Sequence, residues 1–191
     1  MYYSGKDYDE VDEVALRLRI DYGHLDYYLD VIKLAKQLNI VLTKYSTLTD
    51  YQLKTISGSE ELKDGLTIIK KARNGYEFYT YYNDKISTSR IRYTIAHEIK
   101  HVVFLEINPS KKEEALADHF ARYILAPPCL IMSKIAKGYD PSNIAYDFKI
   151  SYEAAGYAYD AAISRLLYNK ANLSDFEEEF IDKFDNNKKK T

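Results

Sequence analysis

The chain has 191 residues, a formal net charge of −2 and a sequence pI of about 6.1. This length predicts a domain of ordinary size that can bury a core without disulfides or a structural metal. The near-neutral charge balance provides no basic surface for phosphate backbones, so we expect a protein partner and no direct contact with nucleic acid.

The single cysteine, Cys129, allows no disulfide within the chain and favours a reducing compartment. We interpret it as a packed small residue and not as a metal ligand. The start of the chain is polar and quickly acidic, unlike a secretory signal peptide, and no run of about 18 apolar residues predicts a membrane span. We therefore expect a cytoplasmic protein.

The N-terminal part begins with a charged leader. From Tyr27 to Leu38, apolar residues recur at helical spacing and predict a helix that packs on the core. Asn39 can end this helix before a short strand at residues 40–42. Residues 45–64 are polar, and we expect a loop there with at most a short helix.

Two β-rich runs follow, at residues 66–72 and 76–82, on either side of Arg73-Asn74-Gly75. An Asn-Gly pair between such runs is a strong hairpin signal. The sequence therefore predicts a strand-rich segment immediately before the next helix.

That next helix carries the pattern His97-Glu98-Ile99-Lys100-His101. Positions i and i+4 lie about 40° apart around a helix axis, so both imidazoles can reach one metal ion. A catalytic zinc usually has three protein ligands and keeps its fourth position for water. Glu98 lies about 100° from His97 around the helix, where a general base can reach that water.

The surroundings of this short motif matter because the motif alone can arise by chance. Residues 91–105 are apolar nearly all the way round, which predicts a buried helix. Buried polar side chains without partners are energetically costly. A metal ion would satisfy His97, Glu98 and His101 together, so the buried helix favours a metal site.

The third ligand is expected from the following helix, at residues 113–125, which has an apolar stripe and is ended by Pro127. Glu114 and Asp118 share one edge of that stripe. Glu114 would complete a His, His, Glu set, and Asp118 could accept the remaining ring N–H of a ligand histidine. Alternatively, both are solvated acids near a helix N-terminus, where negative charge is favoured.

Two neighbours compete with Glu114 as the third ligand. Glu113 is adjacent, and a helix boundary uncertain by one or two residues leaves the register open. His119 is the better zinc ligand by chemistry, but it projects about 140° from Glu114 around the helix, which favours a surface or outer position.

The C-terminal third predicts two helices, at residues 141–148 and 151–168, with helix-start signals at Asp140-Pro141 and Ser151. The pair superficially resembles a helix-turn-helix, but its second helix offers Glu153 and Asp160 instead of a basic face. Packing is therefore favoured over DNA binding. Residues 173–191 change from acidic to basic, and we expect a frayed tail there.

Three stretches resemble the signature of the ImmA/IrrE-type metallopeptidases, which is F-T-x-A-H-E-x-G-H, E-x-x-A-x-x-F-A and L-L-M-P. They are Y-T-I-A-H-E-I-K-H at residues 93–101, E-A-L-A-D-H-F-A at 114–121 and I-L-A-P at 124–127. The spacing from Glu114 to Asp118 is also similar to the E-x-x-x-D of thermolysin-like gluzincins. The resemblance covers roughly residues 25–168. Lys100 and Ala126 depart from it, since they stand where the family has Gly and Met.

The resemblance implies an α+β zincin-like fold, with a small β-sheet packed on the HExxH helix and a second ligand-bearing helix. It implies a Zn²⁺-dependent endopeptidase that cuts a helix-turn-helix repressor encoded nearby, often on a mobile element or prophage or in a stress response. His97, His101 and Glu114 would bind the zinc. Glu98 would take a proton from the attacking water and pass it to the leaving amine.

We expect one zincin-like domain over residues 1–172. It would comprise an N-terminal helical part (24–64), a catalytic core (66–126) and C-terminal helices (140–168). By the resemblance, residues 76–82 would be the edge strand that pairs with extended substrate; an ordinary sheet strand is the alternative.

The donor for the oxyanion of a tetrahedral intermediate has four candidates, Tyr93, Lys100, Tyr157 and Tyr159, and the sequence does not choose among them. A second function comes from a different class. The chain could be a metal-containing regulatory module that binds and sequesters a repressor or toxin without cutting it.

Overall fold

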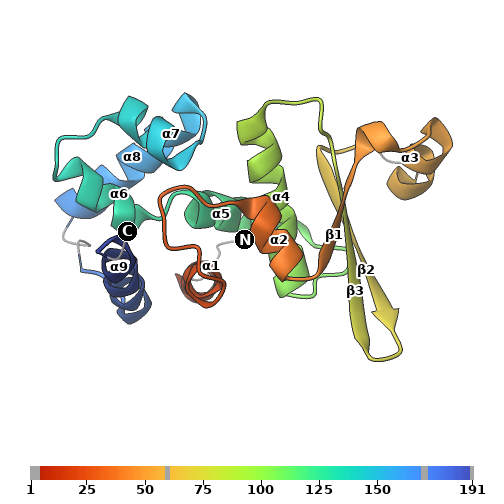
Figure 1. The fold of residues 1–191 in the computed structure, drawn as a ribbon, viewed down its shortest axis with the longest axis horizontal. Helices are drawn as coiled ribbons and strands as arrows, with labels where there is room; N and C mark the ends of the chain where they lie inside the picture. Colours follow the sequence, from red (N-terminus) through yellow and green to blue (C-terminus); the bar gives the residue numbers. More distant parts are fainter. Residues whose placement is uncertain (1–4, 59–60, 169–171, 190–191) are drawn as a thin grey trace. The chain divides into compact units, whose positions relative to one another are not determined.

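The computed structural model describes residues 5–58, 61–168 and 172–189 (Figure 1). It confirms the α+β class, since helices accompany a small mixed sheet. The contacts group the chain into two compact units, and the single domain expected over residues 1–172 stays a prediction. Unit 1 is Met1–Leu29 with Arg122–Thr191, and unit 2 is Asp30–Ala121. The boundary falls inside helix α5 (Lys111–Leu125).

Unit 2 contains a three-stranded sheet in the order β1-β3-β2. Strand β1 (Ile40–Lys44) runs parallel to β3 (Gly75–Tyr82), and β2 (Gly65–Ala72) runs antiparallel to β3. The prediction that residues 76–82 form an edge strand is wrong, because β3 is hydrogen-bonded on both sides. The edge strand that lies beside the predicted metal helix is β2 instead.

The predicted hairpin is confirmed, with its turn one residue earlier than the Asn-Gly pair indicated. Ala72 pairs with Gly75, so Arg73 and Asn74 form the two-residue loop. Gly75 has a φ of +135°, a conformation that glycine adopts without steric penalty. The Asn-Gly pair therefore predicted where the turn is, but the glycine is the first residue of β3 and not part of the loop.

Helix α4 (Thr88–Val103) carries the HExxH motif and contacts β2 and β3. Its N-terminus is capped by Ser87, whose hydroxyl accepts the backbone N–H of Arg90 at 3.3 Å. Helix α2 (Val31–Gln37) contacts both α4 and β1. It begins later than the predicted Tyr27, because the carboxylate of Asp30 caps it by accepting two backbone N–H groups.

The segment between β1 and β2 matches the expectation of a loop with a short helix. A 3₁₀ turn, η1 (Tyr45–Thr47), is followed by α3 (Asp50–Ser57). Thr49 and Gln52 form a capping box at the start of α3. None of the residues of α3 is buried, so this helix adds little to the core.

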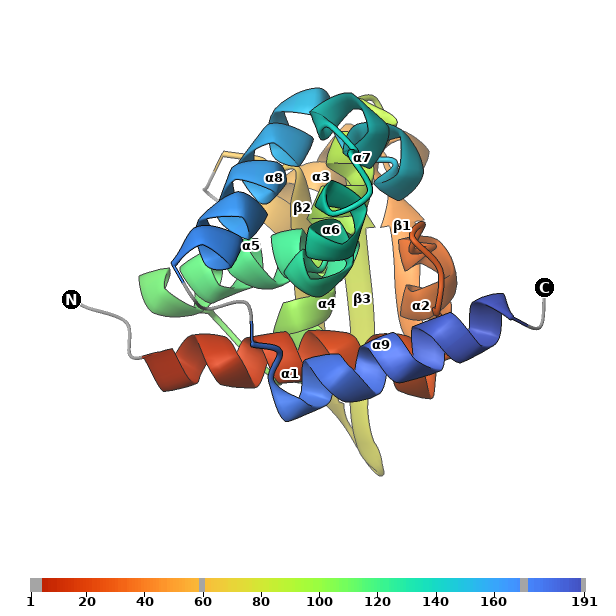
Figure 2. The ribbon, with the colours of Figure 1, turned by 90° about the vertical axis from the view of Figure 1, so that its left-hand side faces the viewer.

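Unit 1 is helical, and its core is rich in phenylalanine. Helices α1 and α9 lie side by side (Figure 2). Phe148, Phe180 and Phe184 are buried, and Tyr27 packs on the rings of Phe148 and Phe184. Besides the unit 1 part of α5, the helices are α1 (Gly5–Asp21), α6 (Pro128–Ile135), α7 (Pro141–Phe148), α8 (Tyr152–Leu167) and α9 (Asp175–Lys188).

The frayed tail predicted for residues 173–191 is wrong over α9. Phe176, Phe180 and Phe184 recur at i, i+4 spacing among acidic neighbours, and the last two are buried. The charged leader likewise contains α1, which buries Val11, Ala15 and Leu16. In both segments a narrow apolar stripe stabilises a helix, although the charged overall composition does not predict one. Residues 190 and 191 lie outside the described part of the chain.

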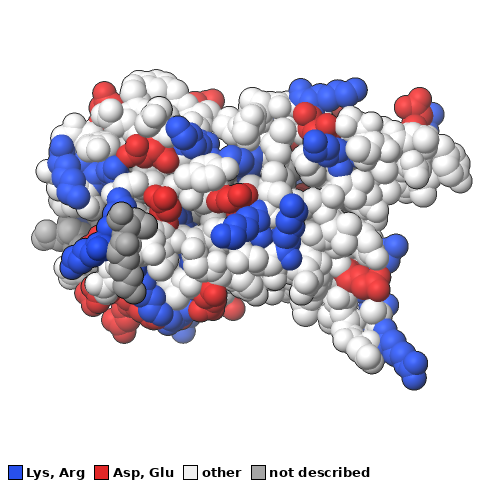
Figure 3. All heavy atoms as spheres, in the orientation of Figure 1, with Lys and Arg blue, Asp and Glu red and all other residues white. Residues whose placement is uncertain are grey.

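The predicted C-terminal helices are confirmed as α7 and α8, which contact each other. Glu153 and Asp160 are exposed on α8. On the face of unit 1 drawn in Figure 3, positive and negative side chains are interspersed. No helix within the described ranges has the length and apolar character needed to cross a membrane.

Cys129, at the start of α6, is a packed residue as expected. Its exposed fraction is 2%. Burial raises the pKa of the Cys129 thiol to about 12, with a smaller contribution from the charge of Glu177. The thiol is therefore protonated at neutral pH and unsuited to metal binding.

Candidate metal centre

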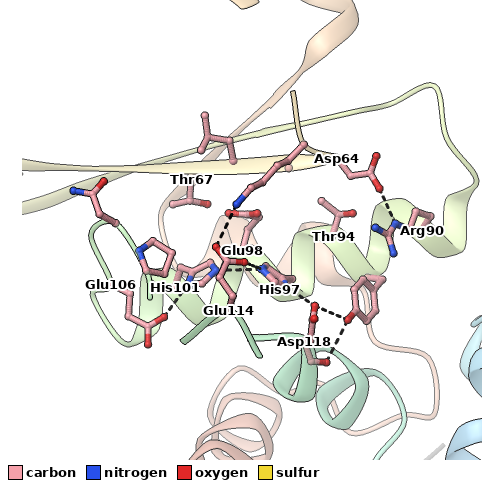
Figure 4. A pocket seen from close by; sticks show the side chains of 16 residues that line it. Asp64, Thr67, Arg90, Thr94, His97, Glu98, His101, Glu106, Glu114 and Asp118 are labelled. Atoms are coloured by element: carbon pink, nitrogen blue, oxygen red, sulfur yellow. Dashed lines mark hydrogen bonds and ion pairs between the residues drawn. The ribbon is translucent and has the colours of Figure 1, made fainter. Parts of the chain in front are cut away.

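Helices α4 and α5 bring the three predicted ligands together in unit 2 (Figure 4). The Nε2 atoms of His97 and His101 are 3.1 Å apart, and His97 Nε2 lies 3.2 Å from Oε2 of Glu114. One donor atom from each residue lies within 4.8 Å of the others. The i, i+4 spacing thus places both imidazoles on one side of α4, and the first turns of α5 supply the carboxylate.

Each histidine turns its other ring nitrogen towards a carboxylate. His97 Nδ1 lies 3.0 Å from Oδ1 of Asp118, and His101 Nδ1 lies 2.7 Å from Oε2 of Glu106. An ionised carboxylate only accepts hydrogen bonds, so both rings donate from Nδ1. Their Nε2 lone pairs then point at the shared centre. Asp118 has the outer position predicted for it.

This arrangement fits a zinc ion. Two imidazole lone pairs and a carboxylate oxygen converge, and all three are acceptors that repel one another unless a cation lies between them. Zinc binds nitrogen and oxygen at about 2.0–2.2 Å in a tetrahedron, which places neighbouring ligand atoms about 3.3 Å apart. The 3.1 Å and 3.2 Å separations are close to that spacing. His97, His101 and Glu114 would hold the ion.

The contact of Glu106 with His101 was not predicted from the sequence. A motif that ends helix α4 brings Glu106 to this position. Leu105 has a φ of +52°, its N–H donates to Val102, and the N–H of Glu106 donates to the carbonyl oxygen of His101 at 2.9 Å. These bonds form a Schellman motif, which folds the chain back over the last turn of α4. The Glu106 carboxylate is thereby returned to the His101 ring.

Glu98 lines the same pocket and is almost fully buried, with an exposed fraction of 7%. Burial raises the pKa of Glu98, while a hydrogen bond from Thr67 and the nearby His97 and His101 lower it by less. A carboxylate with a raised pKa is a stronger base than one in water. Glu98 is therefore suited to accept a proton near the candidate metal centre.

Gly65, the first residue of β2, is required by the close approach of α4. A Cβ at this position would overlap Cγ2 of Thr94 and lie 3.0 Å from Oε1 of Glu98. Its role is spatial, because the missing side chain leaves room for Thr94 and Glu98. No sequence signal singled it out, since a glycine at the start of a strand has many explanations.

The three competitors for the third ligand lie in different surroundings. Glu113 forms a capping box with Ser110, because its carboxylate accepts the Ser110 N–H at 2.6 Å and its own N–H donates to the Ser110 hydroxyl. His119 neither joins the ligand cluster nor lines the pocket in the described part of the chain. Glu114 is the residue that meets the two histidines.

The three predicted ligands line a pocket of about 600 Å³, and the other lining residues also belong to unit 2. The strand residues Gly65, Leu66 and Thr67 form part of the wall. At the rim, Lys63 lies with its ammonium 3.4 Å from Oε1 of Glu114. Asp64 accepts a hydrogen bond from Arg90 at 2.7 Å, which joins the start of β2 to the first turn of α4.

Two of the four oxyanion candidates have their polar groups engaged elsewhere. The Tyr93 hydroxyl donates to Asp118 at 2.8 Å, and the Lys100 ammonium is paired with Glu106. Tyr157 and Tyr159 belong to α8 of unit 1. Lys63 was not considered from the sequence, and it is a cation on the pocket rim.

The sequence matches no model of a known protein family and no curated protein.

Proposed function

We propose that the chain is a zinc-dependent endopeptidase. The observation that carries the proposal is the convergence of three acceptor atoms, from His97, His101 and Glu114, beside the buried carboxylate of Glu98. Zinc proteases use such a set with an adjacent general base. The resemblance to the ImmA/IrrE-type metallopeptidases in residues 93–127 supports the same assignment, with a zincin-like architecture for unit 2.

When bound, zinc would supply a Lewis acid that acidifies water and polarises a carbonyl group. The residues of the chain then have separate tasks. Asp118 and Glu106 hold the two imidazoles with their Nε2 atoms towards the centre. Glu98 takes the proton of the attacking water and delivers it to the nitrogen of the departing amine. Thr67 lines the same pocket and partly offsets the effect of burial on the pKa of Glu98.

An extended peptide is the substrate shape that fits the pocket. Strand β2 pairs with β3 on one side, and within the described ranges no strand pairs with its other side. Its first residues, Gly65 to Thr67, line the pocket wall. A peptide added to this edge would form main-chain hydrogen bonds next to the metal centre.

For the substrate we propose a helix-turn-helix repressor encoded nearby, on a mobile element or prophage or in a stress response. This assignment rests on the family resemblance. A cytoplasmic location is part of the same proposal, since a chain with one cysteine forms no internal disulfide and suits a reducing compartment. The alternative, a metal-containing module that sequesters a repressor or toxin, would use the same ligands and leave its partner intact.

The decisive experiment incubates the purified protein with the repressor encoded beside its gene, with and without a chelator. Discrete fragments that require the metal support the peptidase. A stable complex without fragments supports sequestration and overturns cleavage.

A matched pair of variants tests the ligand assignment in the same assay. Glu114→Gln should lose zinc and cleavage, because an amide is a much weaker zinc ligand than a carboxylate. Glu113→Gln, one residue away, should keep both, because glutamine can still cap the helix. Equal zinc contents in the two variants would refute the ligand set.

A further inference from the structure

Lys100 carries a charge where almost none of its side chain reaches solvent. Its exposed fraction is 1%, and the ammonium contacts the Glu106 carboxylate and the Glu113 carbonyl oxygen, the latter at 3.2 Å. The ring centre of Phe104 is 5.1 Å away. A buried ammonium is costly unless it is paired and hydrogen-bonded. A residue that served only to fill space would not need the charge.

The partner of Lys100 leads directly to a predicted metal ligand. One oxygen of Glu106 pairs with Lys100, and the other accepts from His101 Nδ1 at 2.7 Å. The side chains of Glu106 and His101 are 9% and 6% exposed. A charged chain of contacts, Lys100 to Glu106 to His101, therefore ends on a predicted zinc ligand, and all three side chains are largely buried.

The ammonium also reaches the second ligand-bearing helix. The carbonyl oxygen that it contacts belongs to Glu113, the residue before Glu114. Lys100 thus connects α4, the turn after α4 and the first turn of α5. The carboxylate that contacts His97 has different surroundings. The side chain of Asp118 is 48% exposed, and it accepts a hydrogen bond from the Tyr93 hydroxyl.

We propose that Lys100 is a positioning residue for the metal centre, which fixes Glu106 against His101 and the start of α5 beside α4. This inference rests on the zinc site of the proposed function and does not depend on peptide cleavage. The buried ion pair between Lys100 and Glu106 orients the His101 ring directly. The contact of Lys100 with the Glu113 carbonyl oxygen holds the helix that carries Glu114 beside the two histidines. Lys100 therefore strengthens zinc binding without touching the ion.

The test is a double-variant cycle on zinc affinity, measured by competition with a chromophoric chelator. Lys100→Met and Glu106→Gln should each lower the affinity about 10- to 100-fold, the usual range for outer-shell changes. The double variant should bind zinc more tightly than either single variant, because it leaves neither charge buried alone. Lys100→Met would overturn the proposal if it lowered zinc affinity by the same factor whether position 106 is Glu or Gln, because its effect would then come from packing alone.

A matched control comes from the other buried lysine pair. Lys134 is 6% exposed and pairs with Asp147 in unit 1. Lys134→Met should lower the melting temperature and leave zinc affinity unchanged. The absorption spectrum of the cobalt-substituted protein gives a second measurement, since Lys100→Met should alter the ligand-field bands and Lys134→Met should not. Identical cobalt spectra for wild type and Lys100→Met would overturn the proposal.

If Lys100→Met does not fold, Glu106→Asp tests the second contact of the chain, from Glu106 to His101. It keeps the negative charge for Lys100 but shortens the reach to His101, so zinc affinity should fall; unchanged affinity overturns the proposal. The outcomes also separate the two proposals. Wild-type protein that binds no zinc overturns both. Wild-type protein that binds zinc with additive effects overturns only the role of Lys100.

Discussion

Each of the two units buries a glutamate, and the two glutamates are treated in opposite ways. Glu177 of unit 1 is 2% exposed and accepts hydrogen bonds from Arg165 at 2.5 and 2.6 Å and from the Tyr123 hydroxyl at 2.9 Å. The N–H of Ser174 donates to it as well, at 3.0 Å. Glu98 of unit 2 is 7% exposed and has Thr67, two imidazoles and the carboxylate of Glu114 around it.

The pKa values of the two carboxyl groups follow from these surroundings. Burial raises the pKa of Glu177, but the bonds from Arg165, Ser174 and Tyr123 outweigh it, so the net shift is downward. Burial also raises the pKa of Glu98, and there the opposing contacts do not compensate. A carboxylate saturated with donors stabilises a fold. One that is buried with few donors is available to accept a proton, at some expense of stability.

The largest expected effect of breaking this contrast is on catalysis. Glu98→Gln keeps the shape of the side chain but removes the proton acceptor, so cleavage of the repressor should fall about 10²- to 10⁴-fold. Zinc content should stay at the wild-type level, because His97, His101 and Glu114 are untouched. Turnover and metal content of the same preparation check this. Full proteolysis by the variant would contradict the assignment of Glu98 as the base.

The second effect concerns stability in unit 1. Glu177→Ala removes the acceptor for Arg165 and Tyr123 and should reduce the free energy of unfolding by about 3 kcal/mol, as for other broken buried pairs. Denaturant unfolding of the zinc-free protein measures the loss. Zinc affinity of the folded variant should match the wild type. A variant with normal stability and weakened zinc binding would reverse the roles given to the two glutamates.

A smaller effect is expected where β2 and α4 approach each other. Gly65→Ala introduces a Cβ against Thr94 and Glu98, and overpacking of this kind costs about 1–3 kcal/mol. Cleavage should fall as well, since the Glu98 carboxylate must move. Thr94→Ser removes the methyl group that the new Cβ meets, so the double variant should regain stability. Absence of any such recovery would show that the strain lies elsewhere.

Sequence patterns predicted the part of the site that is local. The i, i+4 spacing of His97 and His101, and of Glu114 and Asp118, is a property of any helix, and the structure keeps both pairs. The short β1 and the β2–β3 hairpin followed from β-rich runs and their turn. These signals depend only on near neighbours in the chain.

The contacts that the sequence did not reveal depend on how distant segments return. Glu106 reaches His101 because Leu105 adopts a positive φ. Sequence patterns do not predict a positive φ at a leucine, because this conformation is uncommon for residues other than glycine. Strand β3 lies in the centre of the sheet, and β2 at one edge, because β3 pairs with the distant β1 as well as with β2. Helix α9 was not predicted because acidic residues surround its phenylalanines. Two of them, Phe180 and Phe184, stabilise a helix only because they are buried against other helices of unit 1.

The smallest effect is a difference in pH dependence between the two glutamates, measured on zinc-free protein. Because the pKa of Glu98 is raised on folding, its ionised form opposes folding, and wild type loses stability as pH rises from about 4.3 through the folded pKa. Glu98→Gln removes this loss, so the variant should be the more stable protein at neutral pH, by about 1.4 kcal/mol for each tenfold weakening of the acid on folding.

Glu177 should behave in the opposite sense. Its pKa is lowered on folding, so its contribution is present above about pH 4.3 and is lost as pH falls through the folded pKa. Glu177→Ala should therefore flatten the acid limb of the stability curve and leave the neutral limb parallel to the wild type. Unfolding free energies from about pH 3 to pH 8 distinguish the two cases. If both variants changed the same limb, the two buried carboxylates would share one role, and the separation of base from scaffold would fail.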